Sequence, residues 1–183
     1  MKLPKKRTPR RAETLYEGRF KRLVREDGWE FMERVSASGI VVVLGVTDEN
    51  KVILVEQYRV PVGRRVIEFP AGLARDTEQT RRESLAKAAE RELLEETGYR
   101  ARKLKLLVRG PAASASSRDL MSVFRAYGLQ KVARGGGDET ESIRVHEVDL
   151  KGIRAWLTKK ERQGCLVDPK IYAGLYLLDK ASR

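Results

Sequence analysis

Apolar and polar residues alternate over short distances through the first half of the chain, the pattern of β-strands separated by tight turns. The segment "GRFKRLVREDGWEFMERVSA" contains two such runs joined by Asp27-Gly28, a strong hairpin signal. "GIVVVLGVTDENKVILVEQYRV" repeats the scheme around a polar "TDEN" turn, and "RRVIEFPAGLA" predicts a further short strand ending at Pro70, with Gly72 just beyond it. This pattern predicts a meander of strands with no helix between them.

Helical periodicity first appears between Glu83 and Thr97. Two more strands are expected in "KLKLLVRG" and "LMSVFRAYGL", and "SIRVHEVDL" alternates like another. A helix near "KGIRAWLTKKER" and one opened by Asp168-Pro169, an N-cap followed by proline at the first helical position, close the chain. Strands first, one helix in the middle and helices at the end predict an α/β fold with a mixed sheet covered by helices.

The length of 183 residues suggests one domain, and 41% hydrophobic with 35% charged residues is typical of globular proteins. The longest apolar run, Gly39 to Val46, is far shorter than the ~20 residues that span a bilayer, so no membrane association is expected. The N-terminus lacks the features of a secretory signal, and we expect a cytoplasmic location. Cys165 and His146 are the only residues of their types, which excludes an intrachain disulfide, a Cys/His zinc cluster and a Ser-His-Asp triad.

The net charge of +12 raises the question of nucleic-acid binding. Six basic residues lie within the first eleven positions, which contain no acid, so much of the excess belongs to a basic tail, residues 1–13. A solvated, flexible arm is the simplest interpretation, and attraction to phosphate-rich small molecules or to RNA is the alternative.

The stretch "RELLEETGY", Arg91 to Tyr99, concentrates acidic residues on the predicted helix. At 100° per residue, Glu92 and Glu96 lie 40° apart and Glu95 lies 60° from Glu92, so the three form one stripe. An adjacent face of small and apolar residues is expected to pack on the sheet and fix that stripe in place: Ala86, Ala89 and Leu93.

Crowded carboxylates near a helix C-terminus are unfavourable, because like charges at i,i+4 repel and the helix dipole disfavours anions there. A bound divalent cation, Mg²⁺ or Mn²⁺, would cancel this penalty, since both favour hard oxygen ligands. The alternative is a solvated face in which Arg91 pairs with Glu95. Gly98 is expected to end the helix in the left-handed conformation.

The order of these residues resembles the signature of the Nudix hydrolase family. Glu83, then "SLAKAAE", then "RELLEETGY" matches the second half of that signature without a gap, with Tyr99 in place of an aliphatic residue. Ten residues separate Gly72 from Glu83 where the signature has five, so the loop before the helix differs. Thr80 and Glu83 also have the spacing of a capping box that would begin the helix. The resemblance implies a Nudix-type α/β/α sandwich with a mixed sheet.

The segment "VEQYRVPVGRRVIEFPAGL", Val55 to Leu73, resembles one branch of the family, the ADP-ribose pyrophosphatases and related nucleoside diphosphate sugar hydrolases. This resemblance implies that Arg59, Glu68 and Gly72 contact the substrate and that the Ala71 carbonyl is a metal ligand. The alternatives are an ordinary surface arginine at position 59 and the polar side of an edge strand at position 68. A Ser-Pro-Gly turn common in the branch is absent from "GPAASASSRDL".

The acidic loop "GGGDETESIRVHEV" resembles the same branch. By position, Glu141 would complete the metal site with Glu92 and Glu96, Glu139 would be the catalytic base, and Glu95 would support catalysis. The three glycines would let the loop close over substrate. An acidic hairpin tip is the alternative.

We divide the chain into the tail at 1–13, an N-terminal β-hairpin region at 14–37 and a Nudix hydrolase domain at 38–183. The hairpin region looks too small to stand alone and is expected to contribute to a homodimer. Trp29 within it would stack on the nucleobase, across a dimer interface; packing in the core or an interface is the alternative.

Together these features predict a Mg²⁺-dependent pyrophosphohydrolase of nucleoside diphosphate sugars such as ADP-ribose. The same chemistry on nucleoside triphosphates, dinucleoside polyphosphates or RNA 5′ ends is the first alternative, and a non-catalytic RNA-binding protein is the second. A nucleic-acid partner is not favoured, because the acidic positions of the signature's second half are all present.

Overall fold

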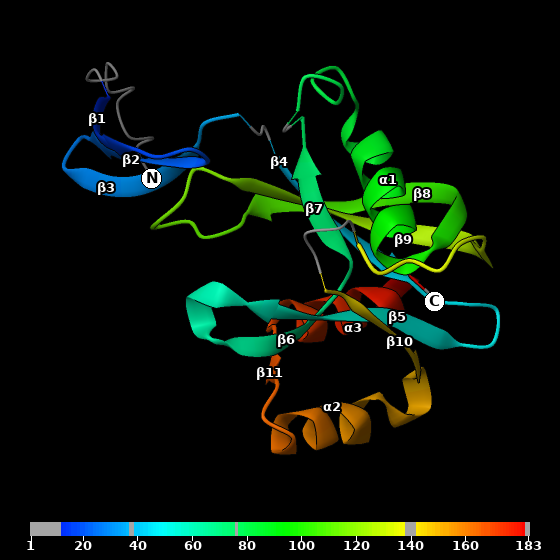
Figure 1. Cartoon of the computed structure of the whole chain (residues 1–183). Helices are drawn as coiled ribbons and strands as arrows, with labels where there is room; N and C mark the ends of the chain where they lie inside the picture. Colours follow the sequence, from blue (N-terminus) through cyan, green and yellow to red (C-terminus); the bar gives the residue numbers. More distant parts are fainter. Residues whose placement is uncertain (1–11, 37–38, 76, 138–141, 182–183) are drawn as a thin grey trace, which may run out of the picture.

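The computed structural model describes residues 12–36, 39–75, 77–137 and 142–181. Its strands form three sheets (Figure 1). The strands are β1 (Glu13–Glu17), β2 (Lys21–Glu26), β3 (Trp29–Arg34), β4 (Gly39–Gly45), β5 (Lys51–Arg59), β6 (Arg64–Glu68), β7 (Ala71–Ala74), β8 (Tyr99–Pro111), β9 (Leu120–Lys131), β10 (Arg144–Asp149) and β11 (Leu166–Val167).

The N-terminal region is an antiparallel sheet in the order β1-β2-β3. Asp27 and Gly28 form the turn between β2 and β3 with φ of 52° and 83°, as the hairpin signal predicts. The structure adds β1, which pairs with β2. This sheet contacts the rest of the molecule where Arg34 pairs with Asp119.

The rest of the chain forms two mixed sheets that share one hydrophobic core. One has the order β7-β4-β9-β8 and the other β10-β5-β6-β11. Parallel pairing of β4 with β9 and of β11 with β6 makes both sheets mixed. The run "GIVVVLG" of β4 is buried on both faces: Val42 and Leu44 belong to the core cluster containing α3, and Val41 and Val43 to the cluster containing α1.

Three α-helices cover the sheets within the described residues: α1 (Leu85–Thr97), α2 (Ile153–Arg162) and α3 (Lys170–Ala181). Figure 1 shows α1 beside β7, β8 and β9, and α2 on the far side of β5, β6 and β10. Asp168 begins α3 as expected, because its side chain accepts a hydrogen bond from Lys170 N at 2.8 Å. The predicted α/β/α arrangement with a mixed sheet and an N-terminal hairpin region is confirmed.

Helix α1 differs from the prediction at its start. The N-cap is Ser84, whose side chain accepts from Lys87 N, and the expected capping box of Thr80 and Glu83 does not form. The Glu83 carboxylate instead accepts from the Arg91 guanidinium and from Arg75 N, partners that lie outside the first turn of the helix. The predicted burial of Ala89 and Leu93 is confirmed, whereas Ala86 is exposed.

Gly98 ends α1 in the left-handed conformation, with φ of 72°, as predicted. A Cβ there would lie 2.1 Å from the Ala133 carbonyl oxygen, so the loop after β9 packs directly on the helix end. Within the described residues, no helix has the length and apolar character needed to cross a membrane.

Candidate active site

A cavity of about 560 Å³ opens beside the second half of α1. Its walls come from β3, β4, β5, β6, β7, β9, α1, the start of α3 and the segment after β8. Most of the predicted site residues that the structure describes line it: Arg59, Glu68, Ala71, Gly72, Glu92 and Glu95. The sequence prediction therefore gathered residues from three separate segments that share one cavity.

Glu92 is held against the backbone of β7. A Cβ at Gly72 would lie 1.9 Å from the Glu92 carboxyl carbon, so the carboxylate occupies the space that any other residue's side chain would need. Gly72 lies inside β7 and not in a turn beyond the strand, because Ala71 and Gly72 pair with Val42 and Val41. The glycine is thus explained by close approach of a carboxylate to the backbone.

Glu96 lies one helical turn further on and is only 3% exposed. Gln57 Nε2 donates to its Oε1 at 3.0 Å, and Ala71 N donates to its Oε2 at 3.1 Å. These bonds fix the carboxylate at the junction of β5, β7 and α1. The Ala71 amide thus binds Glu96, and the Ala71 carbonyl remains a candidate metal ligand.

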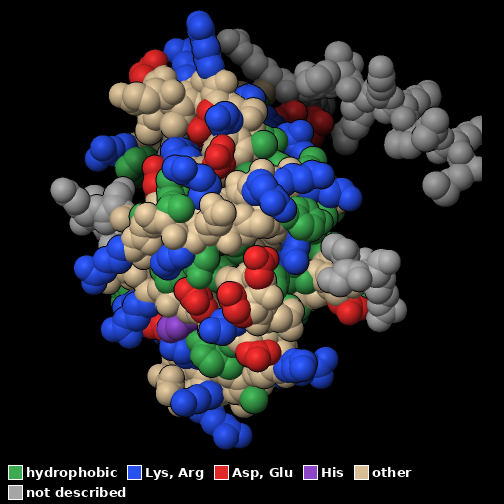
Figure 2. Space-filling model, turned by 90° about the vertical axis from the view of Figure 1, so that its right-hand side faces the viewer, with side chains coloured by type: hydrophobic (Ala, Val, Ile, Leu, Met, Phe, Trp, Pro, Cys, Tyr) green, Lys and Arg blue, Asp and Glu red, His purple; other side chains and the backbone are tan. Residues whose placement is uncertain are grey.

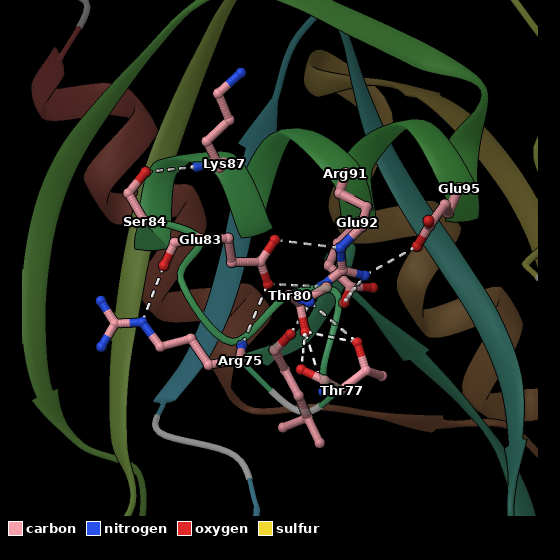
Figure 3. A network of polar contacts seen from close by, with 10 residues as sticks. Arg75, Thr77, Thr80, Glu83, Ser84, Lys87, Arg91, Glu92 and Glu95 are labelled. Atoms are coloured by element: carbon pink, nitrogen blue, oxygen red, sulfur yellow. Dashed lines mark hydrogen bonds and ion pairs between the residues drawn. The ribbon is translucent and has the colours of Figure 1, made fainter.

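Arg91 holds the rim of the site together (Figure 3). Its Nη1 contacts Glu92 Oε1 at 2.8 Å and Glu95 Oε2 at 3.0 Å, while its Nη2 donates to Glu83 Oε1 at 3.1 Å and to the Leu73 carbonyl at 2.9 Å. Burial alone would lower the pKa of Arg91, but its hydrogen bond to Glu83 and the nearby charge of Glu92 outweigh burial and raise it. The guanidinium is therefore a permanent cation.

Glu83, the first glutamate of the signature, lies outside the cavity lining and acts on Arg91. Its carboxylate also accepts from Arg75 N, and its carbonyl accepts from Arg75 Nε at 2.9 Å. Figure 3 shows this network closing the loop before α1, where Thr77 and Thr80 also hydrogen-bond to one another. The loop before α1 is longer than in the Nudix signature, but these bonds hold it closed, and the acidic stripe on α1 keeps the spacing of the signature.

On the opposite wall, Arg59 Nε contacts Glu68 Oε2 at 2.7 Å. Arg59 lies at the end of β5 and Glu68 at the end of β6, and both line the cavity. Lys170, at the start of α3, lines the same wall and pairs with Asp168. The cavity lining therefore mixes both charges: Arg91 pairs with Glu92 and Glu95 on α1, and Arg59 pairs with Glu68 at the ends of β5 and β6.

Trp29 does not line this cavity. It is 62% exposed on β3 and borders a separate hollow with Phe31, Ser117 and Arg118. Packing in the core of this chain is therefore ruled out for Trp29. Its position on the N-terminal sheet leaves an interface role or nucleobase stacking to be tested.

Glu139 and Glu141 lie outside the described residues, but both flanks of their loop are described. Gly136 N donates to the Glu96 carbonyl at 2.8 Å, and Gly137 N donates to the Glu95 carbonyl at 3.1 Å. These bonds cap the C-terminus of α1. The glycines, expected to provide loop flexibility, thus have an observed role in docking the loop on the helix that carries the acidic stripe.

Two contributors to the site were not assigned from the sequence. Gln57 lies in the "EQYR" segment that ends β5, and strand alternation could have indicated that it faces α1. Arg91 was considered only as a partner of Glu95 and proves to bind three carboxylates. The position of Arg91 directly before Glu92 in the signature was the signal that could have indicated this role.

The donor set fits a hard divalent cation such as Mg²⁺. Glu92 and Glu96 project from successive turns of one rigid helix, and the glycine at position 72 leaves room for carboxylate oxygens against the backbone. Over the ranges that the structure describes, no group of three or more His, Cys, Asp or Glu side chains is arranged to hold a metal. A further ligand from the neighbouring loop would have to complete such a site.

The described site thus combines a carboxylate-bearing helix, α1, with a strand, β7, whose glycine admits one of those carboxylates. Residues 37–163 match the NUDIX domain family, and the chain belongs to that family. The prediction of a Nudix hydrolase is confirmed.

Named relatives refine this placement. The chain is 38% identical to the ADP-ribose pyrophosphatase of Bacillus subtilis over 130 residues, covering 70% of this chain and 68% of the relative. It is 33% identical to the methanol dehydrogenase activator of Bacillus methanolicus over 129 residues, covering 70% and 67%. A solved structure titled as an ADP compounds hydrolase superposes with a TM-score of 0.73 at 22% identity over 98% of this chain and 96% of that one, which supports the fold.

Proposed function

We propose that this protein is a Mg²⁺-dependent pyrophosphohydrolase that cleaves nucleoside diphosphate sugars, with ADP-ribose giving AMP and ribose 5-phosphate. The similarity to proteins named ADP-ribose pyrophosphatase supports this substrate class. A cavity of about 560 Å³ lies within the range of small-molecule sites. The lining combines carboxylates (Glu68, Glu92 and Glu95) with cations (Arg34, Arg59, Arg91 and Lys170), a mixture that suits a cation-bound diphosphate.

The observation that carries the proposal is the seating of Glu92 on Gly72 beside the buried Glu96. Two carboxylates one turn apart repel each other, and a bound divalent cation would stabilise the pair further than Arg91 at Glu92 and the hydrogen bonds at Glu96 already do. In our proposal, Mg²⁺, with Mn²⁺ as a substitute, is held by Glu92, Glu96, Glu141 and the Ala71 carbonyl. When bound, it screens the phosphates and stabilises negative charge as the anhydride breaks.

The chain's own residues then have distinct tasks. Arg91 orients Glu92 and Glu95, and Glu95 supports the site from the rim. Arg59 contacts a phosphate or the ribose, and Glu68 fixes the arginine in place. Glu139 accepts a proton from the attacking water. The chain leading into the loop of Glu139 is hydrogen-bonded to the C-terminal end of α1 through Gly136 and Gly137, which favours this assignment.

We further propose that the N-terminal sheet forms a homodimer contact and that Trp29 stacks on the nucleobase across it. Trp29 of β3, Tyr16 of β1 and Phe20, between β1 and β2, are each more than 60% exposed, which supports a contact surface in this region. Light scattering will give the oligomeric state. A monomer with unchanged activity in Trp29→Ala would refute this assignment.

The substrate test uses purified protein, Mg²⁺ and a panel of nucleotide sugars, triphosphates, dinucleoside polyphosphates and capped RNA, with products identified by mass spectrometry. We expect AMP and ribose 5-phosphate from ADP-ribose. Glu96→Gln should lower kcat at least about a hundredfold, and Glu90→Gln, on the same helix outside the cavity lining, is the control. Release of pyrophosphate from triphosphates alone would replace the substrate class, and full activity in Glu96→Gln would refute the site.

Basic side chains are spread over the face shown in Figure 2, with acidic side chains between them. This distribution gives no support to an extended nucleic-acid surface on that face. Residues 1–11 lie outside the described ranges, so deletion of the tail decides whether RNA substrates depend on it.

A further inference from the structure

A second cavity of about 560 Å³ lies apart from the candidate active site. Its lining comes from the turn between β4 and β5, from β9, from the start of α2 and from α3, whose C-terminal end lies beside that turn (Figure 1). No described residue lines both cavities. Met121 of β9 lines the active site and Arg125 lines the second cavity, so four residues, about 13 Å of strand, separate the two.

Arg125 occupies a strand position that alternation reserves for an apolar side chain. Val123 and Met121, two and four residues earlier on the same face of β9, pack with the core cluster that contains α3. Among the described residues, Arg125 Nε and Nη1 are buried and have no hydrogen-bond partner. The Tyr127 ring, whose centroid lies 5.4 Å from the guanidinium carbon, stabilises the cation, but no described carboxylate pairs with it. A largely uncompensated positive charge is therefore placed on the wall of a cavity.

The rest of the lining combines a second cation, an aromatic pair and apolar side chains. Arg154, in the first turn of α2, is exposed. Tyr172 and Tyr176 are one turn apart on α3 and are 51% and 58% exposed, so they present an aromatic wall. Two arginines and one carboxylate, Asp179, give the lining a net positive charge. Most of the other lining residues are apolar: Val46, Leu150, Ile153, Leu175 and Leu178.

We propose that this second cavity is a binding site for a small anion that carries a flat apolar group. The anionic group pairs with Arg125 and Arg154, since guanidinium groups form strong charge-assisted hydrogen bonds with carboxylates and phosphates. The flat group packs against Tyr172, Tyr176 and the apolar residues of the lining. A volume of about 560 Å³ is typical of small-molecule sites. The inference does not depend on the proposed function, because the two cavities share no described residue.

The competing explanation is that the Tyr127 ring alone compensates Arg125 and that the cavity takes no ligand. Four probes separate these explanations in isothermal titration calorimetry of the full chain. Phenyl phosphate and benzoate have both a ring and an anionic group, and the comparison between them distinguishes a phosphate ligand from a carboxylate ligand. Inorganic phosphate has only the charge, and phenol has only the ring. The titrations contain EDTA, so that no divalent cation recruits a phosphate to the candidate active site.

We expect phenyl phosphate or benzoate to bind with a dissociation constant of about 1 mM or lower. This probe should bind at least about tenfold more tightly than phenol or inorganic phosphate. Arg125→Met should weaken its binding about tenfold or more, as expected for loss of a partly buried cation, and Arg154→Met about threefold, as expected for an exposed one. Arg109→Met removes a cation from an exposed position of β8 outside the lining and should leave the affinity within about twofold.

Absence of binding by both aromatic probes at about 10 mM would overturn the proposal. Unchanged affinity in Arg125→Met and Arg154→Met would also overturn it, and the exposed position of Arg154 keeps the test valid if urea titration shows Arg125→Met to be unfolded. An equal loss of affinity in Glu96→Gln would place the probe in the candidate active site and refute the second site. Inorganic phosphate binding as tightly as phenyl phosphate would refute the requirement for a flat group. Lack of pyrophosphohydrolase activity would refute only the proposed function.

Discussion

The carboxyl carbon of Glu92 lies 1.9 Å from the position that a Cβ at Gly72 would take. Gly72 is in β7 and Glu92 in α1, so the contact sets how closely the helix approaches the strand. Because Arg91 also donates to the Leu73 carbonyl of β7, helix and strand are joined on both sides of the contact.

Substitution of Gly72 by alanine should therefore displace Glu92. We expect kcat to fall at least about a hundredfold and the free energy of unfolding to fall by about 1–3 kcal/mol, as in other overpacked sites. Gly110→Ala is the matched control, since a Cβ at that strand position meets no atom within 4 Å. Kinetics and urea titration of both variants test this. A Gly72→Ala enzyme with wild-type kcat would show that the position of Glu92 is unimportant.

Local signals in the sequence predicted much of the fold because local chemistry decides those features. Asp27-Gly28 formed its turn, Asp168 capped α3 and Gly98 ended α1, each through bonds within a few residues. Strand β7 was not predicted because it has only four residues, directly follows Pro70 and contains Gly72, a residue type that is common in turns. Its pairing with β4, about 30 residues earlier in the sequence, makes it a strand.

Contacts between distant residues were harder to predict. Glu83 was expected to cap its own helix, but Arg91 eight residues later provides a stronger, charged partner. Gln57 and Glu96 are 39 residues apart, and no local pattern pairs them. The acidic stripe could be predicted since helix geometry fixes the relative directions of Glu92, Glu95 and Glu96.

Arg91 should be essential for the geometry of the rim. Arg91→Met removes contacts to three carboxylates and a carbonyl, leaving Glu83 and Glu92 without their shared cation. We expect the free energy of unfolding to fall by about 2 kcal/mol, the range of charge-assisted hydrogen bonds, and kcat to fall more than tenfold. Arg81→Met, which breaks an exposed pair with Glu78, is the control and should change stability by less than about 0.5 kcal/mol.

Arg125 is expected to lower stability. Among the described residues its Nε and Nη1 are buried without a hydrogen-bond partner, and burial lowers its pKa although Tyr127, whose ring centroid lies 5.4 Å from the guanidinium carbon, opposes the shift. Arg125→Met removes this desolvation cost while keeping much of the side-chain volume, so the free energy of unfolding should rise by about 1 kcal/mol. Arg109→Met, on an exposed position of β8, should leave it within about 0.5 kcal/mol. Destabilisation by Arg125→Met would mean that the contact of the guanidinium with the Tyr127 ring outweighs its desolvation cost.

The stability of the protein should be sensitive to acid because of Glu56, a buried carboxylate of β5. Three basic side chains contact it: Arg65, His146 and Lys160. The pKa of Glu56 is lowered to about 2, so its contribution to stability is present above the ordinary carboxyl value near 4.5 and is lost as pH falls toward 2.

The pKa of His146 is also lowered, first by burial and then by the charges of Lys160 and Arg144, with Glu56 opposing them. Protonation of His146 therefore costs stability as pH falls below about 6.5. Both shifts have the same sign, so the free energy of unfolding from urea titrations should decline from pH 7 to 5 and more steeply below 4.5. His146→Gln should remove the decline between pH 7 and 5 and keep the steeper one. A profile unchanged by this substitution would place the proton uptake at another group.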